Sequence, residues 1–224
     1  MSPADRGNAW GALTALLAWF AIVLQLVLVL DANLALGKSV LATVIAFLSY
    51  FTITTNLLIA AGLTWRLLAP QTRAGQFFSH PSTTTATAVY ILVVAVVYAV
   101  LLRNLSHPQA WEKAADQLLH QVVPVLYLIH WIIWAPRGYL PWRSTLTWLL
   151  YPLLFLGYTL ARGALIGRYP YPFMDVAKLG YPRVLVNAAV LAGVFGLLGL
   201  AFVAADRALA RRSTRRRAVP PTMR

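Results

Sequence analysis

The chain has 224 residues, of which 60% are hydrophobic and 11% are charged, and its mean hydropathy of +0.68 excludes an ordinary water-soluble domain. The formal net charge is +13, and seven of the 19 basic residues lie in the terminal segment 206–224, directly after an apolar stretch. This placement is typical of a cytoplasmic segment that contacts anionic lipid headgroups, so we expect no nucleic-acid partner.

The apolar residues form six blocks, several of which reach the roughly 18–20 residues needed to cross a bilayer. The first block is longer than the apolar core of a secretory signal, and the segment before it is barely basic, so we expect a retained helix. No block alternates apolar and polar residues as barrel strands do. The sequence therefore predicts an all-α polytopic membrane protein, a single six-helix bundle formed by residues 1–206. The predicted spans lie near residues 10–30, 40–67, 84–102, 116–135, 145–161 and 184–206.

The distribution of basic residues predicts how the bundle is oriented. Six spans place both termini on one side, and the arginine-rich tail predicts that this side is cytoplasmic. The outward loop 162–183 carries four basic residues, which opposes this orientation, but the tail carries more. We expect the tail, residues 207–224, to be disordered. The lack of cysteine and the Ala/Arg-rich tail favour a multi-pass protein of a bacterial inner membrane.

The second span carries an unusual set of polar side chains in the stretch "LSYFTITTNLLIA", residues 48–60. Thr52, Thr55 and Asn56 are spaced i, i+3 and i+4, which places them on one face of a helix. Thr54 faces elsewhere, and its hydroxyl is expected to bond to an earlier backbone carbonyl. Such residues often serve only to pack helices together in membranes, and that interpretation remains open for this segment.

The fourth span adds titratable groups. Asp116 and His120 are four residues apart, so the carboxylate lies one helical turn from the imidazole and is positioned to orient a general base. Counting from the inner ends of the two spans places Thr52 and His120 in the outer half of the bundle. His130 falls among tryptophans near the inner interface, where an interfacial role is expected.

A third candidate element is the outward loop with the sequence "GRYPYPFMD", residues 167–175. Its two Tyr-Pro pairs and Phe173 predict a stiff aromatic segment, because proline fixes its own φ and restricts the preceding residue. Tyr171, Pro172 and Phe173 are candidate pocket residues, although the segment taken in isolation is more typical of an interfacial aromatic belt. Asn187, near the outer start of the sixth span, is a further candidate for the pocket or for a packing contact.

The segments "SYFTITTNLL", "HQVVP" and "YPFMD", in this order and on these spans, resemble the FAR-type androgen-induced family of membrane proteins. That family includes the androgen-dependent TFPI-regulating proteins and bacterial members, and the likeness covers nearly the whole chain except the tail. Animal members are intramembrane threonine hydrolases that cleave fatty acid esters of hydroxy fatty acids. The resemblance implies that Thr52 is the nucleophile and His120 the essential histidine.

The resulting hypothesis is an intramembrane hydrolase of lipid esters, with membrane lipids and the ester substrate as its partners. His120 takes the proton of Thr52, Asn56 is a conceivable oxyanion donor, and Asp116, or alternatively Asp175, orients His120. Thr55 is a supporting residue. The alternative is a non-catalytic membrane protein, either a lipid-binding or sensory bundle or a small transporter. The sequence has no glycine-rich phosphate loop and no metal-ligand cluster, so we expect neither a cofactor nor a metal.

Overall fold

The computed structural model describes residues 2–105, 107–138 and 140–218, and all of its regular elements in these ranges are helices. The elements in chain order are α1 (Pro3–Ala35), α2 (Val40–Leu48), α3 (Phe51–Leu68), α4 (Arg73–Ser79), α5 (Pro81–Val97), the π-helix η1 (Tyr98–Leu102), α6 (Ala110–Gln117), the π-helix η2 (Leu118–Val122), α7 (Val123–Trp134), α8 (Ser144–Trp148), α9 (Leu150–Ile166), the 3-10 helix η3 (Pro172–Met174) and α10 (Val176–Ala218).

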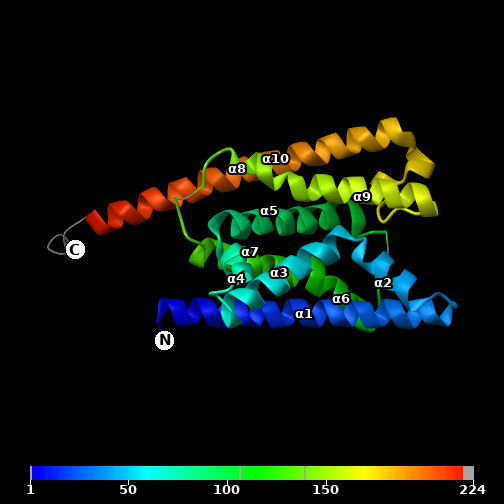
Figure 1. The fold of residues 1–224 in the computed structure, drawn as a ribbon, viewed down its shortest axis with the longest axis horizontal. Coiled ribbons are helices and arrows are strands. Elements are labelled where there is room, and N and C mark those ends of the chain that lie inside the picture. The colour runs from blue at the N-terminus through cyan, green and yellow to red at the C-terminus, as the bar shows by residue number, and fades with distance from the viewer. Residues whose placement is uncertain (1, 106, 139, 219–224) are drawn as a thin grey trace.

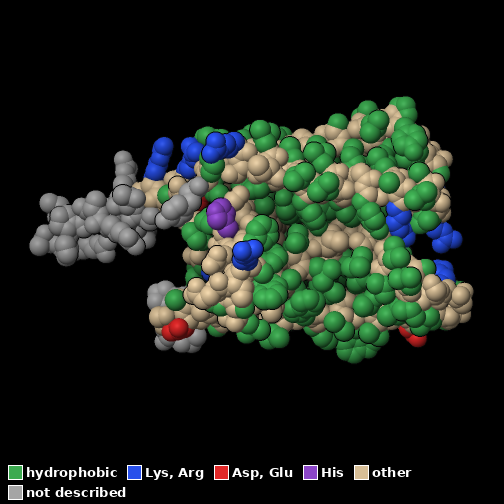
Figure 2. Space-filling model, viewed as in Figure 1, with side chains coloured by type: hydrophobic (Ala, Val, Ile, Leu, Met, Phe, Trp, Pro, Cys, Tyr) green, Lys and Arg blue, Asp and Glu red, His purple; other side chains and the backbone are tan. Residues whose placement is uncertain are grey.

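Six helical segments of the described chain are long and apolar enough to cross a membrane, which confirms the predicted all-α polytopic bundle. The segments lie side by side, and the N-terminus lies at the same end of the bundle as the last described turns of α10 (Figure 1). Hydrophobic side chains cover most of the face shown in Figure 2, while lysine and arginine side chains lie toward its two ends. This distribution is expected where the apolar belt contacts lipid and the ends contact water.

The second span is broken into two helices, so the prediction of one continuous helix near residues 40–67 is wrong. Helix α2 ends at Ser49, whose hydroxyl donates to the Ile45 carbonyl at 2.6 Å and also contacts the Tyr158 hydroxyl at 2.8 Å. Tyr50 is extended and is the N-cap residue of α3. A hydroxyl bonded back to the preceding turn bends a helix. The break places Thr52 in the first turn of α3 instead of mid-helix.

Proline explains the irregularities of the fourth and fifth spans. Pro124 has no N–H to bond to the carbonyl four residues earlier, which is that of His120. The backbone there widens into η2, where the Val123 N–H bonds to the Leu118 carbonyl, five residues back. The fifth span is interrupted at Leu149, shortly before Pro152.

The last span contains a sharp bend and continues further than predicted. Gly180 has a φ of +72°, a conformation that glycine adopts without steric cost, and it bends α10 near its start. Helix α10 then continues through Ala218. Residues 207–218 of the predicted tail belong to this helix, and residues 219–224 lie outside the described residues.

The core that supports the site is built mainly from aromatic rings and small residues. Phe51 packs against the rings of Tyr151, Phe155 and Phe195, with ring centroids 5.0, 5.1 and 5.8 Å away. On α1, buried alanines face the bundle, and small residues of this kind let helix backbones approach closely in membranes. Phe51 directly precedes Thr52, so this cluster anchors the first turn of α3.

Candidate active site

Thr52 is the second residue of α3, in a turn whose N-cap residue, Tyr50, provides no side-chain hydrogen bond. Its side chain is 8% exposed, and it lines a cavity of about 660 Å³. The Thr52 backbone N–H donates to the hydroxyl of Tyr171, 3.5 Å away. The first N–H groups of a helix lack intrahelical partners and carry the positive end of its dipole. The hydroxyl of Thr52 therefore lies where negative charge is stabilised.

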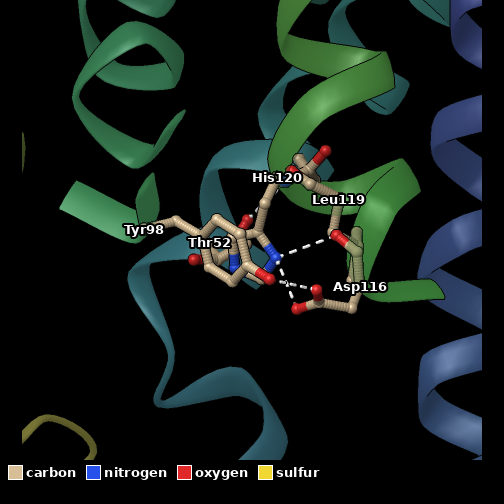
Figure 3. A network of polar contacts seen from close by, with 6 residues as sticks. Thr52, Tyr98, Asp116, Leu119 and His120 are labelled. Atoms are coloured by element: carbon tan, nitrogen blue, oxygen red, sulfur yellow. Dashed lines mark hydrogen bonds and ion pairs between the residues drawn. The ribbon is translucent and has the colours of Figure 1, made fainter. Parts of the chain in front are cut away.

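Asp116, His120 and Tyr98 form a compact polar group on the same cavity (Figure 3). The Nδ1 atom of His120 lies 3.1 Å from the Asp116 carboxylate and 3.0 Å from the Asp116 carbonyl oxygen. The Tyr98 hydroxyl donates to the other carboxylate oxygen. The rings of Tyr98 and His120 are stacked, with centroids 4.0 Å apart and planes 16° from parallel. The predicted contact between Asp116 and His120 is present.

These contacts determine which nitrogen of His120 is available as a base. Both neighbours of Nδ1 are oxygen acceptors, so Nδ1 carries the proton of the neutral ring and the lone pair is on Nε2. No described residue bonds to Nε2. A histidine that acts as a general base has one ring nitrogen hydrogen-bonded to a carboxylate and the other nitrogen free to accept a proton, and His120 has this arrangement.

Asn56 joins the helix of Thr52 to the helix of His120. Its Nδ2 atom donates to the carbonyl oxygen of Thr52 at 2.8 Å and to that of Leu119 at 3.2 Å. Both amide hydrogens are thus engaged, and none is left for a substrate oxygen. Its Oδ1 atom is buried without a partner among the described residues. Asn56 holds the two helices together, and the geometry does not favour it as an oxyanion donor.

Thr52 and His120 line the same cavity, but no hydrogen bond joins them in the described structure. A second, apolar cavity of about 90 Å³ lies beside the first and is lined by residues such as Val94, Phe155 and Phe195. Thr52, Leu102 and Tyr171 line both cavities. Thr52 thus lies at the boundary between a polar chamber and an apolar one.

The aromatic loop reaches into this boundary. Tyr171 is 8% exposed, and its ring stacks on Phe173 with centroids 5.2 Å apart. Phe173 lines the apolar cavity, and Pro172 lines the polar one. Asn187 donates to the Phe173 carbonyl at 2.8 Å and so fixes the loop against α10. Burial raises the pKa of Tyr171 to about 12, so its hydroxyl stays protonated at neutral pH.

Other sequence candidates lie elsewhere. Asp175 lies 3.7 Å from the Lys178 ammonium and lines neither cavity, so Asp116 is the carboxylate that contacts His120. The Thr55 hydroxyl lies 3.3 Å from that of Tyr151 and packs α3 against α9. His130 is 1% exposed, inside the bundle, with Nε2 bonded to Arg66 at 3.0 Å.

Sequence reasoning missed several residues of the polar cavity. The sequence does not mark Tyr98 as a candidate, because a single tyrosine in an apolar span forms no motif. Its partner, Asp116, belongs to a different span. Lys38, Arg162 and Arg168 also line the cavity. The excess of basic residues in the outward loop opposes the positive-inside rule, and this departure could have indicated that Arg162 and Arg168 have another role.

Among the described residues, no group of three or more His, Cys, Asp or Glu side chains is placed to hold a metal ion. Comparisons of the chain with protein-family models, with curated proteins and with solved structures give no significant match.

Proposed function

We propose that the chain is an intramembrane hydrolase of lipid esters, with Thr52 as the nucleophile and His120 as the general base. One observation carries the proposal: Thr52, at the start of a helix, and His120, bonded to a carboxylate, line one cavity, and Thr52 also lines the adjoining apolar chamber. A threonine hydroxyl is a weak nucleophile and needs a neighbouring base. Asp116 and Tyr98 hold the histidine in the orientation and tautomer for that task.

The reaction follows two steps. Thr52 Oγ1 attacks the ester carbonyl carbon, and its proton passes to His120 Nε2. When the tetrahedral intermediate collapses, the bond to the alcohol oxygen breaks and His120 returns the proton to that oxygen. The acyl group is then carried on Thr52. Water, deprotonated by the same nitrogen, releases the acid and restores the threonine.

The two chambers suggest how a substrate binds. The apolar cavity takes the acyl chain, because its walls are aliphatic and aromatic side chains. The polar cavity, with Lys38, Arg162 and Arg168 on its wall, takes the alcohol portion. The resemblance to the androgen-induced family makes fatty acid esters of hydroxy fatty acids the first substrates to test.

The proposed setting is a bacterial inner membrane with both termini in the cytoplasm, where the basic end of α10 meets anionic lipid headgroups. In that orientation the polar cavity lies in the outer half of the membrane. Cysteine-accessibility labelling in whole cells tests this, because a cysteine introduced at the exposed position Leu36 is then accessible from outside and one introduced at the exposed position Gln71 is not.

A lipid-binding bundle without turnover is the second candidate. The missing hydrogen bond between Thr52 and His120 favours it, since the two side chains must move closer before a proton can pass. Catalytic contacts often tighten only when substrate binds, which keeps hydrolysis as the leading proposal.

The test compares Thr52→Ala and His120→Ala with the wild-type protein in detergent and in vesicles. Each variant is expected to lose ester hydrolysis and labelling by an alkyl fluorophosphonate while keeping its thermal midpoint. Thr147→Ala is the matched control, because this exposed threonine bonds to the Ser144 carbonyl of its own helical turn and lines neither cavity. Labelling that survives both alanine variants would reject the assignment, and ligand binding without turnover would favour the lipid-binding bundle.

A further inference from the structure

We propose that Tyr171 is a further catalytic residue, whose hydroxyl donates a hydrogen bond to the substrate's carbonyl oxygen as Thr52 attacks. This inference rests on the proposed hydrolase function and assigns the oxyanion donor that the sequence left open.

The hydrogen-bond partner of the Tyr171 hydroxyl belongs to the first turn of α3. It is the Thr52 backbone N–H, which donates at 3.5 Å. No described residue accepts a hydrogen bond from the phenolic proton. Tyr171 is thus a polar side chain bonded directly to Thr52, whereas no hydrogen bond joins His120 to Thr52 in the described structure.

The Tyr171 hydroxyl lies close to where the substrate's carbonyl oxygen becomes negatively charged during the attack by Thr52. Attack by Thr52 Oγ1 moves the negative charge onto an oxygen bonded to the same carbon, within a few ångströms of Thr52. The start of α3 also places the positive end of the helix dipole there. The Thr52 N–H already donates to the Tyr171 oxygen, so the phenolic proton is the donor that remains for the substrate oxygen.

The structure also holds the phenol rigidly, which a preorganised donor requires. Its ring stacks on Phe173, and the edge of Tyr50 packs against it with centroids 5.8 Å apart. Asn187 fixes the Phe173 carbonyl, and Pro170 and Pro172 restrict the backbone on either side of Tyr171. Little reorganisation is then needed when the substrate oxygen arrives.

The proton balance of the step is simple. The Thr52–carbon bond forms, the carbonyl π electrons move onto oxygen, and the Thr52 proton goes to His120 Nε2. Tyr171 keeps its proton and shares it with the oxyanion. Because its hydroxyl remains protonated well above neutral pH, its contribution is expected to be constant across the working range.

The experiment compares Tyr171→Phe with Tyr181→Phe in the full-length protein. Tyr181 is a half-exposed tyrosine a few residues further along the chain, and it lines neither cavity. Tyr171→Phe is expected to lower kcat by roughly 10²–10³-fold, the usual effect of removing one oxyanion donor, with KM nearly unchanged. The rate of fluorophosphonate labelling should fall in parallel, while Tyr181→Phe keeps both rates.

Binding of a non-hydrolysable ether analogue separates catalysis from structure. A packing role for Tyr171 would weaken this binding, whereas a donor role leaves it unchanged. The thermal midpoint is expected to fall in either case, because Tyr171→Phe leaves the buried Thr52 N–H without its acceptor. Replacing Tyr171 with p-aminophenylalanine, which restores a donor at the same ring position, should recover much of kcat. A wild-type kcat in Tyr171→Phe, or an inactive but folded amino variant, would overturn the assignment. Failure of Thr52→Ala to abolish turnover would instead reject the hydrolase proposal itself.

Discussion

Asn56 on α3 donates a hydrogen bond to the carbonyl of Leu119, the residue directly before His120. The same amide group donates to the carbonyl of Thr52. One buried side chain therefore sets the position of the candidate nucleophile relative to the candidate base. Without this amide, the two carbonyl groups would each lose a hydrogen-bond donor in a region of low dielectric, where water cannot replace it.

Replacing Asn56 with leucine tests this link, because leucine keeps the size of the side chain and removes both donors. We expect a loss of about 1–3 kcal/mol in the free energy of unfolding. We also expect kcat to fall more than KM rises, since the two helices lose their fixed register. Thermal unfolding and ester hydrolysis measure the two effects. An unchanged unfolding midpoint would contradict the structural role.

The contact between Asp116 and His120 predicts that the negative charge of Asp116 increases kcat. Asp116→Asn keeps an oxygen for Nδ1 but removes the negative charge that stabilises the protonated ring during turnover. We expect kcat to fall on the order of 10²-fold, within the usual range for acid–base catalysis. Asp175→Asn is the control, since Asp175 contacts Lys178 and no histidine. Equal effects of the two substitutions would argue against the assignment of Asp116.

Helix α9 approaches the aromatic loop so closely at Gly163 that adding one methyl group there should destabilise the protein. A Cβ added at Gly163 would lie 2.0 Å from the ring of Tyr169, so Gly163→Ala must displace the loop that carries Tyr171. We expect a destabilisation of about 1–3 kcal/mol and reduced turnover. Gly157→Ala on the same helix meets nothing within 4 Å and is expected to be neutral or slightly stabilising. Matched unfolding curves check both variants.

The apolar cavity predicts how acyl-chain selectivity can be changed. Ala188 lines this cavity, whereas the adjacent Ala189 is exposed and does not. Ala188→Leu should fill part of the chamber and shift kcat/KM toward shorter acyl chains. Each methylene group of the substrate that can no longer be buried there should lose about 0.8 kcal/mol of binding free energy. Ala189→Leu should leave the preference unchanged. A series of esters that differ only in chain length provides the measurement, and identical profiles would place the acyl chain elsewhere.

Local sequence patterns predicted the elements correctly where the signal lies within one segment. Asp116 and His120 are one helical turn apart, so their contact follows from helix geometry alone. The bond from Thr54 back to the preceding turn has the same local origin. The sequence gives no sign of the interruption at Ser49, because residues 48–60 contain neither proline nor glycine.

By itself, the sequence determined that this chain crosses a membrane six times as helices, because the transfer of each apolar block out of water depends on that block alone. It also showed which spans carry polar groups. Only the tertiary structure decided which of these groups meet: Tyr98 with Asp116, Asn56 with Leu119, and Tyr171 with Thr52. Those pairs join segments 18 to 119 residues apart, and their contact depends on how whole helices pack, which no local spacing encodes.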